Sequence, residues 1–270
     1  MQLIPAIDLR CFVKHYLWLQ NSEAITYGLH IFGDGNPGIG FCCQGSLYFD
    51  STLRMSLPQV FGYGQINDHR RFYSSADMQL LVVVLQPFAL SALMRVPAEE
   101  LVNLIVDQQQ LFQSVDTSAF CHLTDPTLSV SHRIGRLETF LSNLFCNRLT
   151  NNHQLIAATI AHIQQLDGQT ASSQLIRFTG YGERYLEKLF KEHIGLSPKR
   201  FARITRILRY MKALNNPHQT GSLTEQAYLA GFYDQAHLNH EFKRFTGVTP
   251  AVFRSKKSSL ALNLFSIEQD

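Results

Sequence analysis

The spacing of apolar residues changes near residue 90 and again near residue 150. Up to about residue 90, apolar stretches rich in Val, Phe, Tyr and Ile alternate with glycine-rich turns, which is typical of β-strands. The clearest stretches are 11–19, 39–49 and 80–85. This pattern predicts a sheet folded into a barrel or a sandwich.

From about 88 to 112 the apolar residues follow a helical spacing that Pro97 interrupts, and Leu104, Ile105 and Val106 are expected on that helix. A second helical pattern covers 131–149. The polar run at 150–153 is the expected domain boundary. Beyond it the pattern predicts no strand and about seven helices, at 154–166, 171–178, 183–193, 197–214, 223–230, 235–245 and 250–256.

Basic residues gather in the second half of the chain. Residues 1–149 hold 9 Lys and Arg against 12 Asp and Glu, a net charge of −3, whereas residues 150–270 hold 15 against 9, a net charge of +6. The second half is therefore the candidate for binding a polyanion. We predict a β-rich domain over 1–150 that binds an effector or dimerises, a helical domain over 151–256 and a tail over 257–270.

Two segments of the helical half, about 171–194 and 223–246, share one arrangement. Each has a short helix, a glycine-containing turn and a second helix with apolar residues at helical spacing. Each second helix ends at a glycine, Gly195 or Gly247, with a proline three residues later. Two helices that cross tightly need such a turn and such a C-cap. The pattern predicts two helix-turn-helix units, and the alternative is an ordinary helical bundle with polar outer faces.

The outward faces of the two second helices carry side chains that suit DNA. Arg and Lys pair with guanine and phosphate, and Gln and Asn pair with adenine. We predict DNA contacts from Arg184, Glu187, Lys188 and Lys191 in the first unit and from Gln235, His237, Asn239, His240 and Lys243 in the second.

The runs YLEKLFKEHIGLSPKRF (185–201) and AGFYDQAHLNHEFKRFTGVTP (230–250) resemble the two halves of the AraC/XylS-type DNA-binding domain. The resemblance covers about 154–255 and implies an α+β protein, in which a β-rich, barrel-like sensor domain precedes an all-α domain with two helix-turn-helix units. It implies a sequence-specific regulator of transcription, more often an activator. Its implied partners are double-stranded DNA, RNA polymerase, a small-molecule effector and a second copy of the chain. One departure is His240, where many relatives have arginine.

No motif points to an enzyme, a metal or a cofactor, and we expect none. The histidines of the first half lack the spacing of cupin-type metal ligands, and no Gly-x-Ser-x-Gly motif occurs. The glycines at 33, 35 and 38 lie among strands, so they indicate a turn-rich hairpin and not a dinucleotide site. The longest apolar run, 80–85, is too short to span a membrane, and the first residues do not form a secretory signal, so we expect the chain to stay in the cytoplasm.

The alternative function is a bifunctional protein with an N-terminal enzymatic domain, cysteine-based or cupin-like, that the DNA reader targets. The adjacent Cys42 and Cys43 are its conspicuous nucleophiles, but their neighbours in sequence supply neither a base nor a cation to activate a thiolate. We expect most aromatic residues of this half in the core, with a subset lining an apolar effector pocket. They are Trp18, Phe32, Phe41, Tyr48, Phe49, Phe61 and Tyr63.

Overall fold

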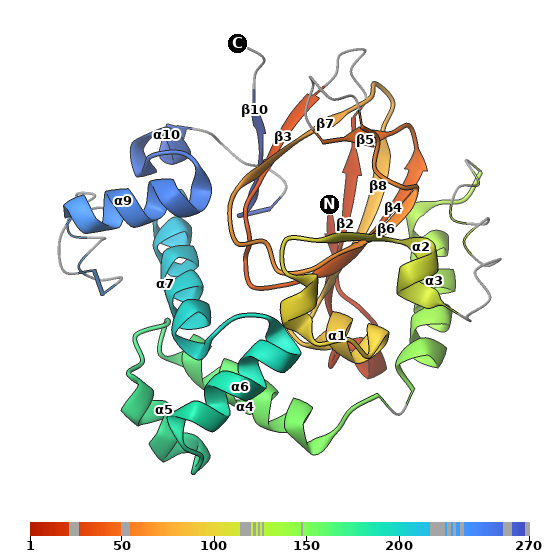
Figure 1. Cartoon of the computed structure of the whole chain (residues 1–270). Helices are drawn as coiled ribbons and strands as arrows, with labels where there is room; N and C mark the ends of the chain where they lie inside the picture. Colours follow the sequence, from red (N-terminus) through yellow and green to blue (C-terminus); the bar gives the residue numbers. More distant parts are fainter. Residues whose placement is uncertain are drawn as a thin grey trace.

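A computed structural model describes residues 1–21, 27–49, 55–113, 120, 123, 125, 127–146, 148–216, 225, 228, 231–232, 235–255 and 261–267. The chain forms a β-rich N-terminal part and a helical part that packs against one end of it (Figure 1). The predicted α+β organisation is confirmed.

Two antiparallel sheets form the β-rich part, which is called the sensor domain after the role that the resemblance predicts. The strands are β1 (Gln2–Leu3), β2 (Val13–Gln20), β3 (Tyr27–Ile31), β4 (Gly38–Gln44), β5 (Leu47–Tyr48), β6 (Val60–Tyr63), β7 (Arg70–Ser74), β8 (Gln79–Leu85), β9 (Ile105–Asp107) and β10 (Leu264–Ile267). One sheet has the order β1-β2-β8-β4-β6-β9 and the other has the order β10-β3-β7-β5. The two sheets stay open, so of the barrel and the sandwich that the apolar pattern predicted, the closed barrel is not formed.

The described helices follow in chain order, with η1 and η2 as short 3-10 segments. They are η1 (Ile7–Leu9), α1 (Ala89–Met94), η2 (Ala98–Leu101), α2 (Gln108–Phe112), α3 (Val130–Phe145), α4 (Asn151–Gln165), α5 (Ser172–Thr179), α6 (Glu183–Ile194), α7 (Pro198–Asn215), α9 (Gln235–Thr246) and α10 (Pro250–Ser255). The expected helix at 223–230 lies mostly outside the described residues. Helix α4 begins at Asn151, inside the polar run that we expected to be a break.

Two predictions from the apolar pattern are wrong. Residues 105–107 form strand β9, not a helix, because Val106 pairs with Gly62 at the free edge of β6. β-branched residues suit that edge better than a helix interior. The helical half also yields a strand, because β10 pairs with β3 of the sensor domain. A four-residue strand that is paired to a distant partner gives little periodic signal of its own.

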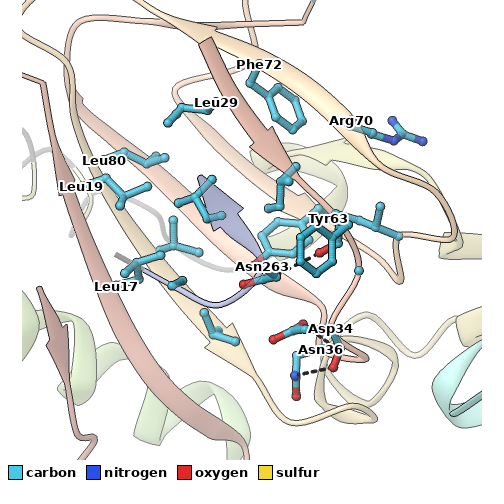
Figure 2. Close-up of a pocket in the computed structure, with 18 of the residues that line it drawn as sticks. Leu17, Leu19, Leu29, Asp34, Asn36, Tyr63, Arg70, Phe72, Leu80 and Asn263 are labelled. Carbon is cyan, nitrogen blue, oxygen red and sulfur yellow. Dashed lines mark hydrogen bonds between the residues drawn. The ribbon is translucent and has the colours of Figure 1, made fainter. Parts of the chain in front are cut away.

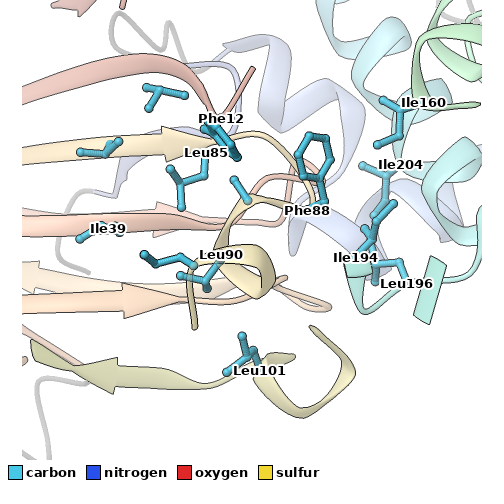
Figure 3. Packing of buried hydrophobic residues seen from close by; sticks show 14 of the residues in the cluster. Phe12, Ile39, Leu85, Phe88, Leu90, Leu101, Ile160, Ile194, Leu196 and Ile204 are labelled. Atoms are coloured by element: carbon cyan, nitrogen blue, oxygen red, sulfur yellow. The ribbon is translucent and has the colours of Figure 1, made fainter. Parts of the chain in front are cut away.

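One hydrophobic core runs from the six-stranded sheet into the helical part without a break. Figure 3 shows Phe12 and Leu85 on the sheet side, Phe88 in the middle, and Ile194 and Ile204 on the helical side. Burial of apolar surface is the main stabilising contribution in such an interface. The two parts are therefore held in a defined arrangement.

Candidate nucleic-acid interface

The first helix-turn-helix unit consists of α5 and α6. Leu175 of α5 and Leu186 and Leu189 of α6 are buried between the two helices and the core. Gly180 ends α5 with φ of 77°, and its N–H donates to the Ile176 carbonyl at 2.9 Å. A Cβ at Gly180 would meet nothing within 4 Å, so the left-handed backbone, and not lack of space, favours glycine here.

The outward face of α6 carries the predicted DNA contacts. Arg184, Glu187, Lys188 and Lys191 are all exposed. Their spacing of i, i+3, i+4 and i+7 places them on one face of the helix. This face is opposite the buried stripe, so all four side chains are free to enter a groove of DNA.

In the second unit, α9 likewise has one buried face and one exposed face. Leu238 and Phe242 are fully buried, whereas His237, Asn239, His240 and Lys243 are exposed. The side chain of Gln235 lies outside the described residues. The second predicted set therefore faces solvent in its described members.

Helix α7 connects the two units. Ser197 caps it, because its hydroxyl oxygen accepts from the Arg200 N–H at 3.2 Å, and Pro198 occupies the first turn. Phe201 and Met211 anchor its buried face. A helix of 18 residues is about 27 Å long. Successive major grooves on one face of DNA are about 34 Å apart, so the connector has the right scale to separate two reading helices.

Glu241 of α9 contacts a cation of α7 and a histidine of its own helix. Arg203 Nε lies 3.4 Å from Glu241 Oε1, and His237 Nε2 lies 3.7 Å from the same oxygen. Arg206 of α7 is half-buried, and its Nη2 donates to the Gly168 carbonyl at 3.1 Å. Arg206 therefore stabilises the domain and is not a candidate for phosphate binding.

A polar cleft of about 320 Å³ separates α9 from the sensor domain. The Arg200 Nη2 donates across it to the Asn67 carbonyl at 3.0 Å. Partial burial lowers the pKa of Arg200, and the nearby carboxylate of Asp68 opposes that shift. The lining includes Asn67, Asp68, Arg200, Arg203, His237, His240, Glu241 and Arg244.

This cleft brings together residues that sequence reasoning missed. The α6 and α9 faces could be predicted from helical spacing, but Arg244 was not in the predicted set. Asp68 comes from a segment of the sensor domain that precedes Arg200 by more than 130 residues, and no local sequence pattern connects it to α7. Its carboxylate places a negative charge beside the cations that could hold DNA phosphate.

The space between the two sheets forms an internal cavity of about 90 Å³ (Figure 2). Its walls are mostly apolar, with leucines of β2, β3 and β8 pointing inward, and Asp34, Asn36 and Asn263 lie at one end. Phe32, Phe61 and Tyr63 line it, whereas Trp18 and Phe41 belong to the main core.

Cys42 and Cys43 are both buried. Burial raises the pKa of both thiols, that of Cys42 to about 11. Arg133 contributes a cation near Cys43 that the local sequence did not reveal, but burial outweighs it. Both thiols are therefore held in their unreactive, protonated form. Cys121 lies outside the described residues.

In the part of the chain that the structure describes, no group of three or more His, Cys, Asp or Glu side chains is arranged to hold a metal ion. The described helices also include none that is long and apolar enough to cross a membrane.

Comparisons with known proteins match the two halves separately. Residues 175–256 match a family described as a helix-turn-helix domain, and residues 1–107 match a domain of unknown function, DUF6597. The regulator GlxA of Rhizobium meliloti, an HTH-type transcriptional regulator, is 29% identical over 114 residues, or 42% of this chain. That match covers 34% of GlxA, so the chain spans about a third of this relative. An HTH-type transcriptional regulator of Haemophilus influenzae is 24% identical over 88% of this chain and 70% of its own length.

A structure of ToxT from Vibrio cholerae has a similar fold over both halves. Its TM-score is 0.50 at 12% sequence identity, with 88% of this chain and 98% of ToxT covered. The α5–α6 unit, helix α9 beyond α7 and the family match of residues 175–256 define the helical half as a helix-turn-helix domain. Both runs on which the AraC/XylS resemblance rests, 185–201 and 230–250, lie within the segment that matches the helix-turn-helix domain family.

Proposed function

We propose that the protein is a sequence-specific DNA-binding regulator of transcription, whose sensor domain binds a mainly apolar small molecule. The observation that carries the first part is the exposed stripe of Arg184, Glu187, Lys188 and Lys191 opposite the buried face of α6. A second exposed face on α9, beyond the α7 connector, supports it. The names of the relatives agree, since both GlxA and the Haemophilus influenzae protein are HTH-type transcriptional regulators.

The cavity between the sheets supports the effector-binding part. Its walls are mostly apolar and carry a few polar side chains, among them Asp34, Asn36 and Asn263, which is the usual composition of a small-molecule site. ToxT of Vibrio cholerae has been crystallised with a bound unsaturated fatty acid. We propose an apolar body with one hydrogen-bonding end as the ligand class. Activation, contact with RNA polymerase, a homodimer and a cytoplasmic location stay predictions from the sequence.

Selection of bound duplexes from a randomised pool, followed by titration of the enriched duplex, tests DNA recognition. We expect Arg184→Ala to weaken binding about tenfold or more and to leave the thermal midpoint unchanged, because the side chain is exposed. Arg136→Ala removes an equally exposed cation from α3 of the sensor domain and is expected to bind as the wild type does. Failure to enrich any sequence, or normal binding by Arg184→Ala, would refute the proposal.

The bifunctional alternative gains no support from the sensor domain. It requires a reactive thiolate, and the two adjacent cysteines are buried with raised pKa values. We propose that the protein has no catalytic role of this kind.

A further inference from the structure

The C-terminal segment, defined here as residues 261–267, returns from the DNA-binding domain to the sensor domain. Its strand β10 pairs antiparallel with β3, with Leu264 opposite Ile31 and Phe265 opposite His30. The Asn263 side chain adds a hydrogen bond, donating from Nδ2 to the Phe32 carbonyl at 3.0 Å. Figure 1 shows this strand beside β3, separate from the helices that precede it.

Successive residues of this segment face different parts of the protein. Ala261, Asn263 and Leu264 line the cavity between the sheets. Phe265 belongs to the main core instead, and its ring lies 6.2 Å from that of Phe253 in α10. Side chains alternate along a strand, so the neighbouring residues Leu264 and Phe265 point to opposite sides, Leu264 to the cavity and Phe265 to the DNA-binding domain.

His30 extends this link to the second helix-turn-helix unit. Its ring stacks on Phe265 at 4.7 Å, and its Nε2 lies 2.6 Å from the Thr246 carbonyl oxygen at the end of α9. A shift of β10 would therefore disturb contacts at both α10 and the end of α9.

The cavity has to expand to hold a ligand of ordinary size. Its volume is about 90 Å³, whereas a benzene-sized ligand occupies a cavity of about 150 Å³. The wall formed by β10 is the easiest one to move, because β10 has 4 residues paired to β3 at the edge of its sheet. In contrast, the opposite wall is formed by β2 and β8, with 8 and 7 residues in the interior of the other sheet.

We propose that the C-terminal segment is the movable wall of the effector site and transmits ligand binding to the second helix-turn-helix unit. The ligand is a mainly apolar small molecule whose polar end meets His15, Asp34 and Asn263. Binding displaces β10 from β3 and so changes the contacts of Phe265 with His30 and Phe253. This inference rests on the proposed function.

The first test holds β10 in place and needs no DNA. Gly28 and Ile267 are directly opposed in the β3–β10 pair, and opposed residues are close enough for a disulfide. The probe is N-phenyl-1-naphthylamine, an uncharged apolar fluorophore, titrated into the full-length double variant Gly28→Cys, Ile267→Cys. We expect oxidation to weaken probe binding at least fivefold and dithiothreitol to restore it. Equal binding in both states, or no probe binding by the wild type, would overturn the proposal.

The second test measures coupling between the two sites. By linkage, a ligand that alters DNA binding has a different affinity in the presence of DNA, and couplings of about fivefold or more are typical. We expect the wild type to bind N-phenyl-1-naphthylamine with an affinity that differs by about fivefold or more between the free protein and its complex with the selected duplex. Phe265→Ala should reduce this difference in probe affinity to within twofold. Phe49→Ala, at the opposite edge of the same sheet, should retain it. Absence of DNA binding would refute the proposed function, whereas normal DNA binding without coupling would refute only the role of the C-terminal segment.

Discussion

His30 of the sensor domain donates a hydrogen bond from Nε2 to the carbonyl oxygen of Thr246, 216 residues later, at 2.6 Å. A carbonyl oxygen only accepts, so Nε2 carries the proton. Thr246 is the last residue of α9, where a helix leaves its carbonyls without partners within the helix. The sensor domain therefore supplies a hydrogen-bond partner for the last carbonyl of α9.

Gly247 follows Thr246 and lies where the end of α9 packs against His30 and His69 of the sensor domain. It has φ of 78°, and a Cβ there would lie 2.7 Å from His69 and 2.9 Å from His30. We expect Gly247→Ala to lower the free energy of unfolding by about 2–4 kcal/mol, since left-handed strain adds to the clash. Urea denaturation measures the loss.

Gly180→Ala is the matched control for this substitution. Gly180 has φ of 77° and also follows a helix, but a Cβ there meets nothing within 4 Å. It is expected to cost only the backbone strain, about 1–2 kcal/mol. Equal losses for the two variants would mean that α9 is not held against His30 and His69.

The parts of the interface that sequence could predict are those with local causes. Arg184, Lys188 and the buried Leu186 follow from the helical period and from the turn at Gly180, which are both encoded within about twenty residues. The docking of α9 on His30 and the return of β10 to β3 depend on contacts between residues far apart in the chain. No periodic pattern within either segment signals such a contact, so only the structure revealed it.

The carboxylate of Asp68 opposes DNA binding if the reading face of α9 binds phosphate in the arrangement seen here. Asp68 lines the same cleft as Arg200, Arg244 and His240, and charges that line one cleft interact even through water. We expect Asp68→Asn to tighten binding of the selected duplex severalfold at low salt, with less gain at high salt because screening weakens the repulsion.

The control for that prediction is Asp77→Asn, which removes the same charge beyond the opposite end of β7. It is expected to leave DNA affinity within twofold of the wild type. If Asp68→Asn weakens binding, the carboxylate organises Arg200 and does not compete with phosphate.

The cysteines should differ in reactivity according to their burial. Cys11 and Cys146 are exposed, whereas Cys42 and Cys43 are buried. The raised pKa of Cys42, about 11, leaves little thiolate at pH 8. We expect iodoacetamide to alkylate Cys11 and Cys146 at least tenfold faster than Cys42 and Cys43 in the native protein, as measured by mass spectrometry of peptides. Fast labelling of Cys42 would revive the cysteine-based alternative.

Acid should destabilise the interface between the two domains through His153, at the start of α4. His153 is buried, its Nδ1 accepts from the Thr150 N–H at 3.1 Å, and its ring lies 4.9 Å from that of His193. Burial lowers the pKa of His153 to about 4 and also lowers the pKa of His193. Protonation of Nδ1 would break the hydrogen bond that caps the helix.

The lowered pKa of His153 determines the direction of the pH effect. Between about pH 6.5 and pH 4 the unfolded chain binds a proton that the folded protein excludes, so stability present above pH 6.5 is lost as the pH falls. From pH 7 to pH 5 we expect the free energy of unfolding in urea to fall by roughly 1–2 kcal/mol. His153→Asn retains an acceptor but no titrating ring, so its loss should be smaller, whereas the exposed His132→Asn should behave as the wild type. An unchanged pH dependence in His153→Asn would show that another group dominates.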